Sequence, residues 1–140
     1  MEPVGTVEGI QYVNDSKATN VDAVRYALQS FDRPIVLIAG GRDKGNDYRT
    51  ISPLLQENVH TVISLGESAP RVEDGMGPFV ETCVRAVSLH DAVQQAHTQA
   101  HPGDVVLLSP ACSSFDMFTN YKDRGNRFRE YVRMLRTSAP

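Results

Sequence analysis

The stretch Pro34-Ile35-Val36-Leu37-Ile38-Ala39-Gly40-Gly41-Arg42-Asp43-Lys44-Gly45 decides the fold of this chain. It begins with an unbroken apolar row, which is typical of a strand covered by helices on both faces. Such strands belong to parallel sheets, in which ligands bind just outside the carboxyl ends of the strands. The row stops at Gly40 and Gly41, which permit positive φ and close backbone approach, and Lys44 then adds a positive charge. A tight turn with solvated charges explains this loop equally well when it is taken alone.

Strands and helices alternate on both sides of this stretch. The expected strands cover residues 10–13, 35–39, 61–65, 79–84 and 105–108, and residues 1–9 show no strong pattern. The expected helices begin after the N-cap Asn20, cover residues 49–57, 67–74 and 89–100, and end with a helix that carries Phe128, Tyr131, Val132 and Leu135 on one face. This order predicts one domain over residues 1–140, an α/β fold that is Rossmann-like and doubly wound. We expect a mainly parallel sheet of five to six strands with helices on both faces.

Composition excludes several classes of protein. The 140 residues carry a net charge of −3, with 41% hydrophobic residues, and no cluster of basic residues suggests nucleic-acid binding. No apolar run reaches the roughly 20 residues that a membrane span needs. Met1 is followed by Glu2 and Pro3 without an apolar segment, so we expect no signal peptide. Cys83 and Cys112 have neither metal-ligand nor disulfide-framework spacing, and we therefore expect a cytoplasmic protein.

Three loops that follow expected strands are rich in functional side chains: Asn14–Asn20, Gly40–Asp47 and Ser109–Tyr121. Parallel topology places all three at the same edge of the sheet. They contribute two lysines, several hydroxyls and backbone N–H groups at helix starts, a combination that favours an anionic ligand. The aromatic side chains of Phe115, Phe118 and Tyr121 can wall such a pocket, although Phe115 and Phe118 fit core positions better.

Other catalytic and metal motifs do not fit. The chain has no G-x-x-x-x-G-K-[ST], no G-x-G-x-x-G and no G-x-S-x-G. Cys112 has no neighbouring histidine in the sequence, and we interpret it as a small buried residue rather than a nucleophile. His97 and His101 share a helix face but lack the glutamate of H-E-x-x-H, so a solvated pair is expected instead of a metal site. From physical reasoning alone, the sequence indicates an anion-binding α/β domain.

Four motifs together carry a resemblance to a known family. They are V-N-D-S-K-A-T-N at residues 13–20, L-I-A-G-G-R-D-K-G at 37–45, L-L-S-P-A-C-S-S-F-D at 107–116 and R-G-N-R-F at 124–128. In this order they resemble the C-terminal domain of the Mur ligases, and the first is characteristic of the branch that adds D-glutamate. The resemblance extends from about Gly9 to Leu135.

The resemblance implies an ATP-dependent amide-bond ligase of peptidoglycan synthesis. In that family, ATP phosphorylates the alanine carboxylate of UDP-N-acetylmuramoyl-L-alanine to an acyl phosphate, and the amine of D-glutamate then attacks. The C-terminal domain supplies the D-glutamate site and closes over ATP that a central domain holds. The implied partners are thus D-glutamate, ATP and UDP-N-acetylmuramoyl-L-alanine. ATP and Mg²⁺ are cofactors of the whole enzyme, and none is expected to be held by this domain alone.

Site residues follow from the matching positions. The resemblance assigns contacts with D-glutamate to Thr19, Lys44, Ser114, Phe115 and Tyr121. It assigns Asn14, Asp15 and Lys17 to the nucleotide, and Lys17 is the expected catalytic residue because its charge would stabilise the transferring phosphoryl group. The family often has Phe where this chain has Tyr121. No general base for the D-glutamate amine is visible, and no metal ligand is assigned.

One departure from the family is large. The family enzyme has three domains, and only the third is recognisable here, so the phosphate-binding loop, the Mg²⁺ ligands and the uridine-nucleotide site belong to the missing parts. We therefore expect an excised or separately expressed domain that cannot catalyse by itself. The alternative is a stand-alone module that binds small anions or dicarboxylates without catalysis. A protein-interaction domain without a ligand is a third reading.

Overall fold

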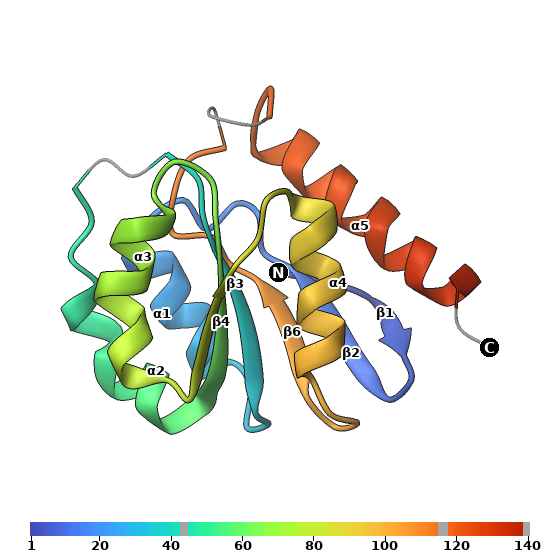
Figure 1. Ribbon diagram of the computed structural model, residues 1–140, viewed down its shortest axis with the longest axis horizontal. Coiled ribbons are helices and arrows are strands. Elements are labelled where there is room, and N and C mark those ends of the chain that lie inside the picture. Colours follow the sequence, from blue (N-terminus) through green and yellow to red (C-terminus); the bar gives the residue numbers. More distant parts are fainter. Residues whose placement is uncertain (43–44, 115–117, 139–140) are drawn as a thin grey trace.

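The computed structural model describes residues 1–42, 45–114 and 118–138, with the side chains of residues 137 and 138 excepted. Within them, six strands form one sheet in the order β1-β2-β6-β3-β4-β5 (Figure 1). The strands are β1 (Glu2–Val7), β2 (Ile10–Asn14), β3 (Ile35–Gly40), β4 (Val59–Leu65), β5 (Thr82–Arg85) and β6 (Val105–Leu108). The pair β1 and β2 is antiparallel and all other neighbours are parallel. The predicted fold class is confirmed.

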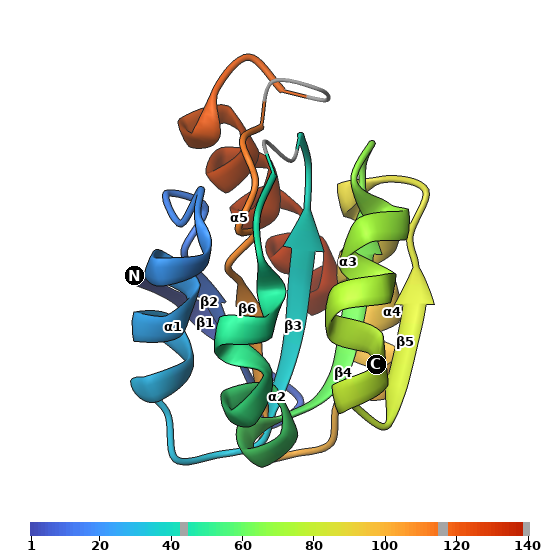
Figure 2. The ribbon, with the colours of Figure 1, turned by 90° about the vertical axis from the view of Figure 1, so that its left-hand side faces the viewer.

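Helices cover both faces of the sheet. The α-helices are α1 (Val21–Gln29), α2 (Ser52–Asn58), α3 (Ala69–Met76), α4 (Leu89–Gln99) and α5 (Tyr121–Ser138). The helices α1, α2 and α3 pack on one face and α4 and α5 on the other, and each face has its own apolar cluster. Figure 2 shows the first three helices in front of the strands and the last two behind them. No helix in the described parts of the chain is long and apolar enough to cross a bilayer.

Local sequence signals explain most of these elements. Every residue of β3 is buried, as its unbroken apolar row predicts. The side chain of Asn20 accepts a hydrogen bond from the Ala23 N–H at the start of α1, and Ser88 does the same for the Asp91 N–H at the start of α4. Each such cap satisfies a backbone donor that the helix itself leaves unpaired and typically contributes about 1 kcal/mol.

The structure corrects the prediction for the N-terminal segment. Residues 1–9 were expected to lack regular structure, yet Glu2–Val7 forms β1 and pairs with β2. As the edge strand, β1 leaves most of its side chains exposed or half-buried, so it needs no apolar alternation. Its partner β2 supplies the register that its own sequence does not specify.

Two further boundaries differ from prediction. The helix expected over residues 49–57 is split into a 3₁₀ turn, Tyr48–Ile51, and α2, because Pro53 has no N–H to continue a helical ladder across the junction. Gly75 was expected to end the third helix but lies inside α3. The ring of Tyr48 leaves no room for a side chain at Gly75, since a Cβ there would lie 2.6 Å from Cδ2 of Tyr48. The following strand accordingly begins at Thr82 instead of Phe79.

Candidate functional site

Three loops meet at the carboxyl edge of the sheet. The first loop (residues 15–20) follows β2, the second loop (41–47) follows β3 and the third loop (109–120) follows β6. The strands β2, β6 and β3 are neighbours in the sheet, so the loops emerge side by side. In Figure 2, β3 points upward toward this edge. The predicted convergence of the three loops is confirmed for the described residues, which exclude 43–44 and 115–117.

Hydrogen bonds join these loops to one another. The third loop meets the first where the Ala111 N–H donates to the Ala18 carbonyl at 2.9 Å. It meets the second where Arg42 and Ser113 exchange backbone hydrogen bonds of 3.0 and 3.2 Å. The Asn46 side-chain amide donates to the Ala111 carbonyl at 2.7 Å. The protein itself therefore holds the three loop backbones in fixed positions relative to one another.

Gly40 and Gly41 make this close approach possible. Their φ angles are +134° and +139°, a backbone conformation that L residues with a side chain rarely adopt. A Cβ at Gly40 would lie 1.9 Å from the Leu65 carbonyl oxygen, and one at Gly41 would lie 2.2 Å from the Ser113 carbonyl oxygen. The interpretation that this pair permits positive φ and close backbone contact is confirmed.

Asp15 begins the first loop with a half-buried carboxylate. Its N–H donates to the Leu108 carbonyl at 2.8 Å, and its Oδ2 accepts from the Ser109 hydroxyl at 3.0 Å. The Met1 amine lies 3.8 Å from Oδ1. Burial raises the pKa of Asp15 above its ordinary value, and the bond from Ser109 opposes that shift only in part. The surrounding protein thus does not fully offset the energetic cost of burying the Asp15 carboxylate.

A cavity of about 310 Å³ opens beside Asp15. Its wall includes Asn14 at the end of β2, Asp15 and Lys17 in the first loop and Tyr121 at the start of α5. Lys17 is exposed and Tyr121 is half-buried. The three residues predicted to contact a nucleotide therefore lie around the same cavity as one residue predicted to contact D-glutamate.

Of the other residues predicted to contact D-glutamate, Thr19 and Ser114 are among the described residues. Thr19 is exposed on the first loop, whereas Ser114 is only 2% exposed in the third loop. Lys44 and Phe115 lie outside the described residues. A single cleft that combines Thr19, Lys44 and Ser114 stays a prediction. Phe118 packs partly buried against the apolar cluster under α4 and α5, as its expected core position implies.

Sequence reasoning missed Arg124, which is 1% exposed in the first turn of α5. Its guanidinium donates hydrogen bonds to Ser16 and Cys112, and thereby connects α5 with the first and third loops. A charged residue is normally assigned to the solvated face of a helix. The signal that could have found it is spacing, because Arg124 lies four residues before Phe128, on the same face as the apolar residues.

Cys112 lies beneath the third loop and is 1% exposed, so the interpretation of a small buried residue is confirmed. Its Sγ is 3.5 Å from the hydroxyl oxygens of Tyr48 and Ser68. Tyr48 lies in the 3₁₀ turn before α2, and Ser68 is the N-cap residue of α3. The thiol therefore belongs to the packing that supports the loops.

His97 and His101 do not form the expected solvated pair. The His97 side chain is 21% exposed, and its Nδ1 contacts the Tyr12 hydroxyl while its Nε2 lies 3.0 Å from a Glu8 carboxylate oxygen. The prediction is wrong for His97 because the hairpin of β1 and β2 brings both partners to it from far along the chain. His101 is exposed, and its ring stacks on His60 with 6.2 Å between centroids. Among the described residues, no group of three or more His, Cys, Asp or Glu side chains has a metal-binding arrangement.

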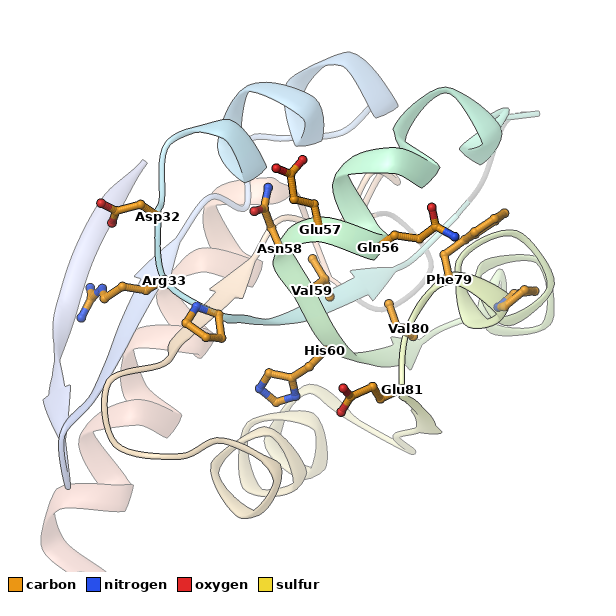
Figure 3. A pocket seen from close by; sticks show the side chains of 12 residues that line it. Asp32, Arg33, Gln56, Glu57, Asn58, Val59, His60, Phe79, Val80 and Glu81 are labelled. Carbon is orange, nitrogen blue, oxygen red and sulfur yellow. The ribbon is translucent and has the colours of Figure 1, made fainter.

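A larger cavity, of about 530 Å³, lies at the opposite edge of the sheet (Figure 3). It is lined by residues at the amino ends of β3, β4 and β5, among them Pro34, Val59, His60 and Glu81. None of the residues predicted from the sequence to bind a ligand lines it. Its position away from the three loops separates it from the candidate site.

Comparison with known proteins gives the family. Residues 1–112 match the sequence model of "Mur ligase, glutamate ligase domain". The UDP-N-acetylmuramoylalanine--D-glutamate ligase of Salinibacter ruber is 60% identical over 135 residues, which cover 96% of this chain and 29% of that protein. The chain thus spans less than a third of the length of the curated relatives that it matches.

Solved structures agree on the fold. A domain from Haemophilus ducreyi has a TM-score of 0.64 at 15% identity, covering 98% of this chain and 97% of that one. The MurF ligase of Thermotoga maritima, in complex with ADP, has a TM-score of 0.59 at 16% identity, covering 96% of this chain and 31% of that one. The family match extends over most of the sequence, and the folds agree over nearly its whole length. The chain belongs to the Mur ligase family, and the part of the family that it matches is the glutamate ligase domain.

Proposed function

We propose that this chain is the C-terminal domain of an ATP-dependent ligase that adds D-glutamate to UDP-N-acetylmuramoyl-L-alanine. The observation that carries the proposal is the carboxyl edge of the sheet. There, hydrogen-bonded loops hold Asn14, Asp15, Lys17 and Tyr121 around one cavity. The Salinibacter ruber relative at 60% identity is a UDP-N-acetylmuramoylalanine--D-glutamate ligase, which is the same activity.

The chemistry of the edge supports this reaction. Lys17 is an exposed ammonium beside the cavity, and such a charge stabilises the negative charge that develops during phosphoryl transfer. D-Glutamate carries two carboxylates, which lysines, hydroxyls and backbone N–H groups bind well. We assign its recognition to Thr19, Lys44, Ser114, Phe115 and Tyr121, of which Lys44 and Phe115 lie outside the described residues.

ATP and Mg²⁺ belong, in this proposal, to the larger enzyme. Asp15 offers a half-buried carboxylate at the edge, and the described residues contain no group of three or more side chains arranged as metal ligands. Asp15 and Lys17 therefore fit the periphery of a nucleotide site and not a complete metal centre. Cys83 and Cys112 are thiols and are not joined in a disulfide, which suits the cytoplasmic location that the proposal includes.

A chimera tests the proposal directly. This chain would replace the matching 29% of the Salinibacter ruber ligase, and phosphate release would be measured with ATP and UDP-N-acetylmuramoyl-L-alanine. We expect release that depends on D-glutamate, with L-glutamate inactive. A folded chimera that accepts a different amino acid, or none, would contradict the proposal.

Lys44→Ala in the same chimera tests the D-glutamate contact. We expect the KM for D-glutamate to rise about tenfold to a hundredfold, because a charged hydrogen bond contributes about 1.5–3 kcal/mol. The matched control is Arg127→Ala, which removes an exposed cation 3.6 Å from Asp123 on the surface of α5. An unchanged KM in Lys44→Ala would remove this residue from the proposed site.

The stand-alone module makes a different prediction. If the 140-residue chain by itself binds a small acid with a micromolar or lower Kd, the binding energy of about −8 kcal/mol is available without other domains. Calorimetric titration with D-glutamate, ATP and other small dicarboxylates distinguishes the two cases. The ligase proposal expects weak binding of all of them.

A further inference from the structure

Arg124 is a buried cation in a protein whose other described arginines are half-buried or exposed. Transfer of a guanidinium out of water is costly unless hydrogen bonds replace the lost hydration. Arg124 has such bonds. Its Nε donates to the Ser16 hydroxyl at 2.9 Å, its Nη2 to the Ser16 carbonyl at 2.8 Å and its Nη1 to the Cys112 carbonyl at 3.1 Å.

The acceptors of these bonds belong to loops and not to the sheet. Ser16 is in the first loop and Cys112 is in the third, 96 residues further along the chain. Gly41 of the second loop lies next to the same guanidinium, since a Cβ built at Gly41 would lie 3.3 Å from Nη1 of Arg124. One side chain from α5 thus bonds to two loops of the candidate site and lies next to the third.

Ser16 extends this connection back to α5. Its hydroxyl, which accepts from Arg124, donates to the Tyr121 carbonyl at 2.7 Å. Ser16 is followed by Lys17, and both Lys17 and Tyr121 line the cavity of the candidate site. The bonds of Arg124 therefore fix the backbone on both sides of that cavity.

A guanidinium suits this task better than an ammonium would. Its donors lie in one plane at fixed angles, so it can bind two loops in a defined relative position. A lysine at position 124 would keep the charge but lack the planar fork that reaches Ser16 and Cys112 together. The positions of these acceptors indicate that Arg124 positions the loops in addition to filling space in the core.

We infer that Arg124 is a positioning residue: it holds the first and third loops against α5 so that Lys17 and Tyr121 face one cavity. Where it concerns catalysis, this inference rests on the proposed function. Displacement of these loops changes the binding of D-glutamate and of ATP together. Binding of UDP-N-acetylmuramoyl-L-alanine, which the proposal assigns to the rest of the enzyme, stays the same.

Arg124→Lys in the chimera tests the inference, with Arg127→Lys as the matched control on the exposed side of the same helix. We expect the KM values for D-glutamate and ATP to rise about tenfold in Arg124→Lys, with the third KM unchanged, and no change in the control. A merely structural role would reduce the folded fraction and hence kcat, and would leave each KM as it is. That second pattern would overturn the inference.

Hydrogen exchange on the 140-residue chain separates this inference from the proposed function. In Arg124→Lys we expect faster exchange at the Ala18 and Ala111 amides, which bond within and between the loops, and unchanged exchange at Ala92 in α4. Unchanged loop exchange would overturn the inference even if the ligase activity is present. An inactive wild-type chimera would instead reject the proposed function, and the exchange data would still decide the role of Arg124.

Should Arg124→Lys fail to fold, Ser16→Ala takes its place. This change removes the hydroxyl between Arg124 and Tyr121 and keeps the Ser16 and Cys112 carbonyls that solvate the guanidinium. The expected results are a smaller rise in the same two KM values, about threefold, and faster exchange at Ala18. If neither changes in folded Ser16→Ala, the inference is wrong.

Discussion

The two edges of the sheet differ in the size of their cavities and in the hydrogen bonding of their polar groups. The amino edge has the larger cavity, about 530 Å³, beside His60, whose ring nitrogens lie 2.9 Å from an Asp104 carboxylate oxygen and 2.7 Å from the Thr61 hydroxyl. The carboxyl edge has a cavity of about 310 Å³. There the loops are bound to one another, and Lys17 remains exposed. We therefore base the proposed ligand site on the loops held in unusual backbone conformations and not on the size of a cavity.

Two carboxylates show the same contrast at closer range. Glu73 in α3 accepts two hydrogen bonds of 2.7 Å from Arg85 and one of 2.7 Å from the Ser64 hydroxyl, and the bonds from Arg85 hold its pKa below the usual value. Burial raises the pKa of Asp15 at the candidate site. A structural carboxylate is thus stabilised as an anion, whereas the carboxylate at the candidate site is kept at a cost to stability.

The largest expected effect comes from Gly40→Ala at the carboxyl edge. A Cβ there meets the Leu65 carbonyl oxygen at 1.9 Å, so backbone must move, and we expect a loss of about 2–4 kcal/mol in the free energy of unfolding. Gly103→Ala is the matched control at the amino edge: its φ is +98°, but nothing lies within 4 Å of the added carbon. Its expected loss is about 1 kcal/mol. Equal losses in urea denaturation would show that the two edges are equally tolerant.

Asp104→Ala sharpens the comparison from the other edge. Asp104 is 5% exposed and accepts hydrogen bonds from the His101 N–H and at the His60 ring, so its removal should lower the free energy of unfolding by about 1–2 kcal/mol. Because we place the ligand site at the carboxyl edge, the KM for D-glutamate of the chimera should not change. A raised KM would move ligand binding to the larger cavity.

A smaller effect than that of Asp104→Ala is expected for two variants whose stability depends on pH through the carboxylates of Asp15 and Glu73. Because the pKa of Asp15 is raised in the folded state, its ionised form costs stability above that pKa, and the cost disappears as the pH falls through it. Asp15→Asn should therefore be more stable than the wild type at pH 7 and equal to it in acid. The pKa of Glu73 is lowered, so its contribution is present above the unfolded pKa and is lost as the pH falls through the folded one.

Glu73→Gln should consequently be less stable than the wild type at pH 7, with the difference vanishing in acid. Melting temperatures of both variants between pH 3 and pH 7, values chosen to bracket ordinary carboxyl pKa values of about 4, measure the two effects. Shifts of the same sign for Asp15→Asn and Glu73→Gln at pH 7 would contradict the contrast.

Ala111→Gly should have the smallest effect. Ala111 has a φ of +64°, where a non-glycine residue is strained by about 1–2 kcal/mol. Glycine relieves this strain but adds about 0.5–1 kcal/mol of unfolded-chain freedom. The free energy of unfolding should change by less than about 1 kcal/mol, because the bonds of the Ala111 backbone to Ala18 and Asn46 remain. A loss above about 2 kcal/mol in urea denaturation would mean that the methyl group itself supports the loops.

Patterns local in the sequence predicted most of the fold. The row of residues 35–39 predicted β3 to within one residue, and Asn20 and Ser88 marked the starts of two helices. The segment of residues 1–9 escaped prediction because an exposed edge strand needs no apolar pattern. Burial of Arg124 escaped it as well, since the acceptors that make a buried cation tolerable come from other loops.

The sequence by itself determined the order of strands and helices from β2 onward, the Gly40–Gly41 pair and the motifs shared with the Mur ligases. Only the tertiary structure decided that Lys17 and Tyr121 border one cavity, that Arg124 is buried and that His97 binds Tyr12. The physical reason is distance along the chain: Ser16 and Arg124 are 108 residues apart. They meet because β6 inserts between β2 and β3, a pairing that depends on long-range packing and not on local propensity.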